Sequence, residues 1–309
     1  LLENQRTELQ LKGQPLATVE LKKGIIQGDA LSPLLFVIAM EPLSRELNAR
    51  CDMVSTENGE VNCNHLIFID DIKLIARRQS DLRELCYRTN WCLQQMGLHI
   101  NQQKSASNVD DDATFGNVVN DIEGYKYLGV LEDSHSMIME ENKTIIADKL
   151  RERVEKLCNT KLNARNLFYA INEFAISTLN YYIGVVDFQP NELEQLDKSI
   201  KQTLAKHSIT RKASNVDRLY LSREELGRGL QNIKEKAEIM LLNLHMRLAQ
   251  GERTKAIIET EKRMATHLGL IKEYLESKYE LSEPKATDVI EKQRENRLSK
   301  IKDKNMHGI

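Results

Sequence analysis

The chain has 309 residues, of which 41% are hydrophobic and 29% are charged, and this length allows two domains with cores of their own. No segment approaches ~20 uninterrupted apolar residues, so we expect no membrane span, and the net charge of −2 argues against a globally basic nucleic-acid-binding protein. Five cysteines without a CxxC or zinc-type spacing favour a reducing compartment. No secretory signal opens the chain, and its first residue is Leu1, so we expect a fragment of a larger polyprotein.

The first elements are predicted from turn and cap residues. Residues 17–21 predict a strand that leads into a glycine-bearing loop. Ser32 and Pro33 then predict the start of a helix, with Ser32 as the N-cap and Pro33 at the first helical position. Apolar residues recur after this start at helical spacing: Leu34, Leu35, Ile38, Leu43 and Leu47.

Two adjacent aspartates, Asp70 and Asp71, lie within the apolar stretch 65–76. The apolar runs on both sides predict two buried strands. A buried carboxylate without a partner is costly, and two adjacent ones repel each other. A divalent metal with oxygen ligands is the usual compensation, so the pattern favours a metal site at the tip of a β-hairpin. Taken alone, such a pair is more often an ordinary turn, which is how we interpret residues 110–112.

The later elements are mostly helical. Ser80 and Asp81 begin a helix that ends at Gly97, and residues 98–100 predict a short strand. Residues 101–124 are polar and irregular, residues 125–131 predict a strand or hairpin, and helices follow from about residue 140. Residues 252–309 carry alternating charges with few apolar positions, which indicates a long exposed helix or a partly disordered tail.

Charge is unevenly distributed along the helical part. Residues 197–228 contain eight Lys or Arg and four Asp or Glu, a local balance of +4. Such a stretch can contact phosphates, although a solvated helical face is nearly as consistent with it.

Four sequence blocks occur in one order: 24–36 (GIIQGDALSPLLF), 68–71 (FIDD), 97–104 (GLHINQQK) and 125–129 (YKYLG). In this order and spacing they resemble the reverse transcriptase palm of non-LTR (LINE-type) retrotransposons. The resemblance covers about residues 10–135. It extends more loosely to about residue 235, where residues 219–230 (LYLSREELGRGL) look like a post-thumb segment of the same elements.

The resemblance implies a fold class and a function. The expected fold is α+β, with a partial polymerase palm (an antiparallel sheet with helices) at 1–135, a helical thumb at 136–235 and a helical connector or tail at 236–309. The implied activity is that of an RNA-directed DNA polymerase in target-primed reverse transcription. Template RNA, primer DNA, dNTPs and two Mg²⁺ ions would take part, together with the rest of a polyprotein that includes an endonuclease. A nuclear location is also implied.

The resemblance also implies roles for individual residues. Asp70 and Asp71 would be catalytic metal ligands, Asp70 the more direct one, with a third carboxylate expected before Leu1. Lys104 would protonate the departing pyrophosphate, and an exposed loop lysine is the alternative. The remaining implied residues fall into two groups: Gly24, Gln27, Gly28 and Phe68 for nucleotide or template binding, and Tyr125, Tyr127, Leu128 and Gly129 for the primer grip. A capped glycine turn and ordinary strand composition are the respective alternatives.

One departure from the family pattern bears on activity. Ile69 precedes the aspartates where relatives usually carry Ala, and sometimes Met or Val. We expect its β-branched side chain to crowd the primer end, so that Ile69→Ala in a complete polymerase would raise activity. With one carboxylate missing, we expect the chain to be inactive by itself. Two other interpretations stay open: a non-catalytic nucleic-acid-binding scaffold or decayed relic of a reverse transcriptase, and a helical protein-interaction module that rests on residues 140–309.

Overall fold

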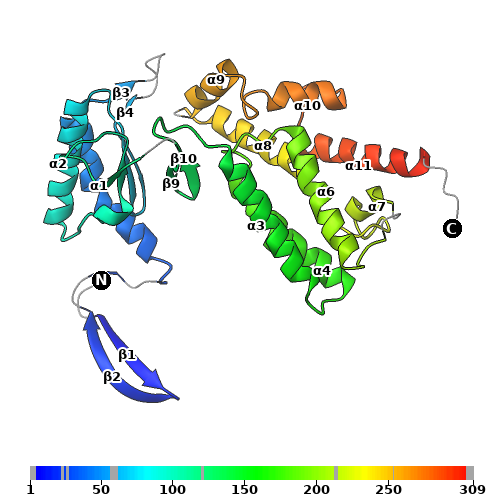
Figure 1. Cartoon of the computed structure of the whole chain (residues 1–309), viewed down its shortest axis with the longest axis horizontal. Helices are drawn as coiled ribbons and strands as arrows, with labels where there is room; N and C mark the ends of the chain where they lie inside the picture. The colour runs from blue at the N-terminus through cyan, green and yellow to red at the C-terminus, as the bar shows by residue number, and fades with distance from the viewer. Residues whose placement is uncertain are drawn as a thin grey trace. The chain divides into compact units, whose positions relative to one another are not determined.

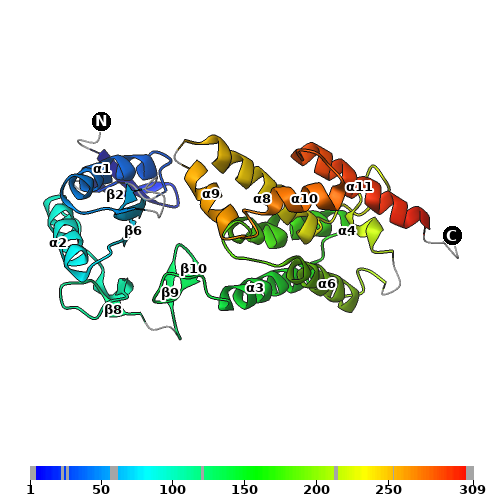
Figure 2. The ribbon, with the colours of Figure 1, turned by 90° about the horizontal axis from the view of Figure 1, so that it is seen from above.

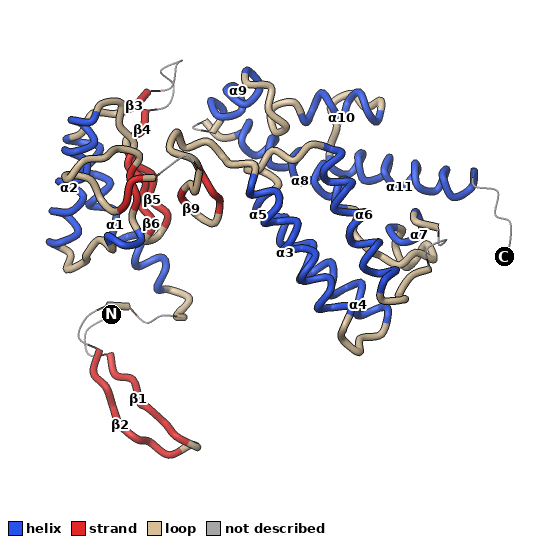
Figure 3. Tube along the Cα trace, in the orientation of Figure 1, coloured by secondary structure: helices blue, strands red, loops and turns tan. Residues whose placement is uncertain are grey.

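A computed structural model describes residues 5–21, 24–25, 28–55, 62–119, 122–211, 215–252 and 254–303. The chain divides into two compact units, Leu1–Glu123 and Gly124–Ile309 (Figure 1). An α+β part followed by helices is confirmed, but the described strands form separate two-stranded pairs rather than one antiparallel sheet (Figure 3). The expected functional boundaries at residues 135 and 235 stay predictions.

The first unit begins with an exposed hairpin. Strand β1 (Gln5–Leu11) pairs with β2 (Gln14–Leu21), which contains the predicted strand at 17–21. The two loop residues, Lys12 and Gly13, have φ values of 50° and 79°, as a type I′ turn requires. The side chains of residues 6–20 are all exposed, so this hairpin adds nothing to the core of its unit.

Two helices and one hairpin build the core of the first unit. Helix α1 (Ser32–Arg50) packs on α2 (Gln79–Gln95), and the hairpin of β5 (His65–Phe68) and β6 (Asp71–Leu74) rests its inner face on both. Leu31 is the N-cap of α1, so the expected cap at Ser32 is wrong by one residue; the Asp29 carboxylate accepts a hydrogen bond from the Leu31 amide at 2.8 Å. The buried centre consists of Met40, Leu43, Leu47, Leu85, Cys92 and Leu93.

The end of α2 follows its sequence signal. Gly97 has φ 72° and its amide donates to the Gln94 carbonyl, while the Leu98 amide donates to the Leu93 carbonyl at 2.8 Å. These two bonds define a Schellman motif. The strand expected at 98–100 is absent from this described segment, because Leu98 and Ile100 pack on the core instead. The short elements of this unit are the 3-10 turn η1 (Gln102–Lys104), the antiparallel pair β3 (Val54–Ser55) and β4 (Asn62–Cys63), and the parallel pair β7 (Ala106–Ser107) and β8 (Asn117–Val118).

A buried amide joins the end of α1 to the β5–β6 hairpin. Asn64 is 0% exposed, and its Nδ2 donates to the Leu47 carbonyl at 3.0 Å and the Cys51 carbonyl at 3.3 Å. The His65 Nδ1–H donates to Asn64 Oδ1 at 2.6 Å, and the Ser44 hydroxyl donates to His65 Nε2 at 2.7 Å. The two bonds that Asn64 Nδ2 donates tie the hairpin to the C-terminal end of α1, where the Leu47 carbonyl also accepts from the Cys51 amide at 3.1 Å.

The second unit contains one hairpin and a helical body. Helices α8, α10 and α11 lie on one side of this unit, and α3 with α6 lies on the other (Figure 2). None of the described helices is long and apolar enough to cross a membrane. The elements are β9 (Tyr125–Tyr127), β10 (Val130–Glu132), α3 (Glu141–Cys158), α4 (Ala164–Ala170), the π-helix η2 (Ile171–Ala175), the 3-10 turn η3 (Ile176–Thr178), α5 (Leu179–Tyr182), α6 (Pro190–Lys206), α7 (Asp217–Tyr220), α8 (Ile233–Gln250), α9 (Lys255–Arg263), α10 (Ile271–Tyr279) and α11 (Ala286–Asp303).

Helix α8 begins at a buried carboxylate from α6. Asp197 is 4% exposed and accepts hydrogen bonds from the Ile233 amide at 3.0 Å and the Lys234 amide at 3.4 Å. A negative charge at a helix N-terminus is favourable, but burial is the larger effect and raises the pKa of Asp197 to about 6. Asn232 caps the same helix by accepting from the Glu235 amide at 2.9 Å.

The C-terminal helices pack on α8, so the expectation of a long exposed helix is wrong. Charged residues dominate this part of the sequence, but several apolar residues of α9, α10, α11 and the connection between α9 and α10 are buried: Ile258, Leu268, Ile271, Leu275, Tyr279 and Val289. Glu238 of α8, 4% exposed, accepts from Lys278 at 2.6 Å, from the Tyr279 hydroxyl at 2.7 Å and from Gln293 at 3.1 Å. One buried carboxylate therefore ties α10 and α11 to α8.

We expect Asn64→Ala to lower the free energy of unfolding of the first unit by about 2–4 kcal/mol, because it removes the hydrogen bonds of a buried amide to the Leu47 and Cys51 carbonyls and to the His65 ring. Trp91, the single tryptophan, lies in α2, so its fluorescence during urea unfolding reports on this unit. The control is Asn48→Ala on the exposed side of α1, which should change stability by less than about 0.5 kcal/mol. Equal effects of the two substitutions would contradict the role of Asn64.

The stability of the first unit should also depend on pH through His65. Burial lowers the pKa of His65 below its usual 6.5, so the unfolded chain takes up this proton more readily than the folded one. The stabilisation is complete above about pH 6.5 and is lost as the pH falls from there through the lowered folded-state pKa. Trp91-monitored unfolding from about pH 7.5 to about pH 5 should lose stability more steeply than in His65→Gln. Parallel curves would show that His65 does not carry this dependence.

Candidate functional site

The aspartate pair lies at the tip of the β5–β6 hairpin. Phe68 pairs with Asp71 in the strand register, which leaves Ile69 and Asp70 as a two-residue loop. Ile67 and Ile72 pack against the core, while Phe68 on the other face is 58% exposed. The expectation of two buried strands is therefore wrong, because the described hairpin buries one face only.

The carboxylates themselves face solvent. Asp70 and Asp71 are both exposed, and neither forms a hydrogen bond or ion pair with another residue in the described part of the chain. Their charges are thus hydrated, and the cost of burial, which the sequence argument used, does not apply here.

The oxygen atoms of the aspartate pair can be compared with the ligands that a divalent metal requires. Asp70 and Asp71 supply carboxylate oxygens, which are the ligands that Mg²⁺ prefers. Within the described ranges no group of three or more His, Cys, Asp or Glu side chains gathers where a metal could bind. The two aspartates therefore suit Mg²⁺ as some of its ligands, and the remaining ligands would have to come from other groups.

The loop residue before the pair has an unusual backbone conformation. Ile69 has φ 56°, as the first central residue of a type II′ turn requires, a position that favours glycine. A β-branched residue in this region is strained by about 1–3 kcal/mol. The departure seen in the sequence at Ile69 therefore coincides with a strained position next to Asp70.

The other candidates in the first unit lie in loops. Lys104 is an exposed residue of η1, and its amide donates to the Asn101 side chain at 3.3 Å; its role as a proton donor stays a prediction. Gly24 and Gly28 have φ values of 89° and 93°, and a Cβ added at either would meet no described atom within 4 Å. The glycines are thus used for their backbone conformation in open space. Gln27 lies outside the described residues.

The expected primer-grip residues form the β9–β10 hairpin of the second unit. Its loop residues Leu128 and Gly129 have φ values of 46° and 86°, again a type I′ turn. Asn142 of α3 holds the hairpin by accepting from the Leu131 amide at 2.9 Å and donating to the Leu131 carbonyl at 2.9 Å. The Tyr181 hydroxyl donates to the Leu128 carbonyl at 2.5 Å.

Sequence reasoning missed both supports of this hairpin. Tyr181 is separated from Leu128 by 53 positions, and no local pattern links them. Asn142 lies in the first turn of α3, where a polar residue is usual. The signal that was present is the hairpin itself, since Tyr125 and Tyr127 are half-buried strand residues as expected.

Residues 2–131 match the family model described as Reverse transcriptase (RNA-dependent DNA polymerase). The match covers less than half of the chain. It includes Asp70, Asp71 and Lys104 and extends into β10. It identifies a reverse transcriptase domain in this part of the sequence.

A curated relative matches a shorter segment. The chain is 35% identical over 66 residues to an uncharacterized mitochondrial protein of Arabidopsis thaliana, which corresponds to 20% of this chain and 54% of the relative. The chain thus spans about half the length of that protein.

The strain at Ile69 gives a testable expectation. Ile69→Gly should raise the free energy of unfolding of the first unit by about 0.5–1 kcal/mol, since glycine adopts a positive φ without a Cβ penalty. Ile69→Ala keeps the Cβ and should gain less. The control is Val118→Gly at an exposed strand position, where the substitution should lower the free energy of unfolding. A stability loss on Ile69→Gly, measured by Trp91 fluorescence, would show that the side chain contributes more than its backbone costs.

Proposed function

We propose that this chain is part of an RNA-directed DNA polymerase of a non-LTR retrotransposon, which transfers nucleotides from dNTPs to a primer 3′-hydroxyl in target-primed reverse transcription. The observation that carries the proposal is the position of Asp70 and Asp71. They form an exposed carboxylate pair at the tip of the β5–β6 hairpin, whose loop has two residues. The hairpin lies inside the segment that matches the reverse transcriptase model.

The chain's own residues divide the work of this reaction. Asp70 and Asp71 would hold divalent metal ions, which when bound stabilise the charge that develops on the attacking and leaving oxygens. Lys104 would donate a proton to the departing pyrophosphate. The loop of Leu128 and Gly129, held by the Tyr181 hydroxyl, would support the primer backbone.

The partners and the compartment belong to the same proposal. Template RNA, primer DNA and dNTPs are the substrates that this activity requires, and an endonuclease in another part of a longer polyprotein would supply the nicked primer. We place the reaction in the nucleus, while the printed name of the Arabidopsis relative describes that protein as mitochondrial. Cell fractionation with an antibody against the chain decides between these two compartments.

One observation favours a second candidate, a non-catalytic nucleic-acid-binding scaffold derived from a reverse transcriptase. The described residues gather no third acidic ligand near the pair, and Ile69 is strained where relatives usually carry a smaller residue. Both candidates predict binding of a primer–template duplex, so only metal binding and catalysis separate them.

Metal binding is expected to require the pair. Mn²⁺, which replaces Mg²⁺ and is counted by electron paramagnetic resonance, should bind residues 1–309 at a site that the double change Asp70→Asn and Asp71→Asn removes. The matched control is Asp110→Asn with Asp112→Asn, two exposed aspartates of the solvated run, which should leave Mn²⁺ binding unchanged. Equal Mn²⁺ binding by all three proteins would remove the metal role of the hairpin.

Polymerase activity is expected to need more than this chain. Residues 1–309 should bind an RNA–DNA primer–template in a mobility-shift assay but extend the primer at background level with Mg²⁺ and dTTP. Extension that Asp70→Ala abolishes would show that a complete site is already present. Absence of primer–template binding would contradict both the polymerase and the scaffold.

A further inference from the structure

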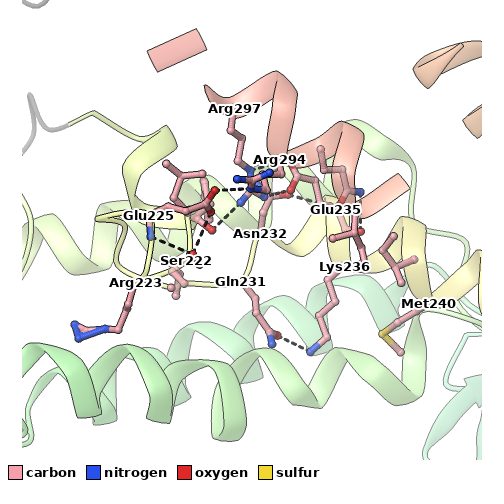
Figure 4. A pocket seen from close by; sticks show the side chains of 17 residues that line it. Ser222, Arg223, Glu225, Gln231, Asn232, Glu235, Lys236, Met240, Arg294 and Arg297 are labelled. Carbon is pink, nitrogen blue, oxygen red and sulfur yellow. Dashed lines mark hydrogen bonds and ion pairs between the residues drawn. The ribbon is translucent and has the colours of Figure 1, made fainter. Parts of the chain in front are cut away.

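The second unit contains a pocket between the loop that follows α7, helix α8 and helix α11 (Figure 4). Its volume is about 640 Å³, within the range of small-ligand sites. We propose that this pocket binds single-stranded RNA, with separate backbone phosphates contacting Arg223 and Lys236. The inference rests on the proposed function only for the nature of the partner, and it concerns residues that the polymerase proposal does not use.

The loop that forms one wall is rigidly built. It belongs to residues 219–230, the segment that resembles the post-thumb region. The Gly229 amide donates to the Leu221 carbonyl at 2.9 Å, and the Leu230 amide donates to the Leu219 carbonyl at 2.9 Å. A Cβ at Gly227 would lie 2.0 Å from the Leu221 oxygen, so this glycine is required for the close approach of the two backbone segments.

Two side chains anchor this loop from outside. Asn172 of the π-helix donates to the Gly229 carbonyl at 2.8 Å and accepts from the Gln231 amide at 2.9 Å. Arg294 of α11 pairs with Glu225 of the loop. The pocket is therefore preformed, and a ligand would not have to order its walls.

Positive charge in the pocket is only partly neutralised. Arg294 and Arg297 pair with Glu225 and Glu235, whereas the Lys236 ammonium donates to the neutral Gln231 side chain at 2.8 Å. Burial lowers the pKa of Lys236, an effect that Glu173 opposes.

Arg223 is exposed and has no ion-pair partner in the described part of the chain. Together with Lys236 it leaves two charges without a bound carboxylate. In Figure 4, Lys236 and Gln231 meet on the side of the pocket away from Arg294 and Arg297. In the same view the Arg223 and Lys236 side chains end on opposite sides of the pocket, so each cation would contact a different phosphate of an RNA backbone.

Apolar side chains complete the wall beside these charges. Ile239 and Met240 of α8 and Ile290 of α11 line the pocket, and Ile290 is 51% exposed. Backbone phosphates satisfy the two cations through charge-assisted hydrogen bonds, and a base or ribose covers the apolar surface. A nucleotide joins both groups in one unit of this size, whereas inorganic phosphate would leave the apolar wall in water.

The test uses residues 1–309 and a fluorescently labelled single-stranded oligouridylate, with binding followed by anisotropy at several salt concentrations. Arg223→Gln and Lys236→Met should each weaken binding about threefold to tenfold and reduce the slope of log affinity against log salt by about one. The matched control is Lys161→Gln, an exposed lysine between α3 and α4 that does not line the pocket. Circular dichroism melting confirms that each variant is folded.

A second measurement locates the RNA. Oligouridylate that carries 4-thiouridine should crosslink on irradiation to peptides from 220–240 or 286–297, and uridine monophosphate should compete better than inorganic phosphate. Crosslinks confined to other peptides, or unchanged salt slopes in both variants, would overturn the inference and leave the polymerase proposal standing. Stronger competition by polyglutamate than by uridine monophosphate would point to an acidic peptide instead. Failure of the unaltered chain to bind any RNA would overturn both.

Discussion

A buried polar side chain must find hydrogen-bond partners, and in this protein that requirement decides which elements meet. Asn64 binds the end of α1 to the hairpin that carries the aspartate pair. Asn142 binds α3 to the β9–β10 hairpin, and Asp197 holds the start of α8. Glu238 then fastens α10 and α11 to α8. Each of the four side chains is at most 4% exposed, so the loss of any one would remove hydrogen bonds between at least two elements.

The two candidate sites differ in how much of their environment the chain supplies. Asp70 and Asp71 project from a hairpin whose opposite face is buried, and their oxygens have no partner in the described part of the protein. The pocket beside α8 is lined by the loop after α7, by α8 and by α11, and its polar groups are already engaged with one another, apart from the charges on Arg223 and Lys236. The first site therefore depends on ligands from outside, whereas the second is organised before anything binds.

Local signals in the sequence were sufficient to predict the positions of several elements. The glycine that ends α2 and the β9–β10 hairpin lie where composition places them, because turns and caps are decided by a few neighbouring residues. The aspartate pair was found for the same reason, and the family match includes it. The sequence pattern overestimated its burial, since periodicity cannot tell a strand packed on one face from a strand packed on both.

Contacts between residues far apart in the sequence could not be predicted from local sequence patterns. The Tyr181–Leu128 bond and the Asn172 contacts to the loop near Gly229 join segments with no shared motif. The packing of α9–α11 was missed because charged residues outnumber the few apolar positions that decide it, such as Leu275 and Val289. Burial depends on which face a residue occupies rather than on average composition.

The π-helix at Ile171–Ala175 makes this part of the chain sensitive to length. A π-helical turn accommodates one residue more than an α-helical turn, so a single-residue deletion there would restore ordinary α-helical winding at little local cost. The same deletion would rotate Asn172 away from Gly229 and Gln231 and release the loop that it holds. A gap at this position in a related sequence would therefore mark a protein that keeps the helix but has lost the fixed loop beside it.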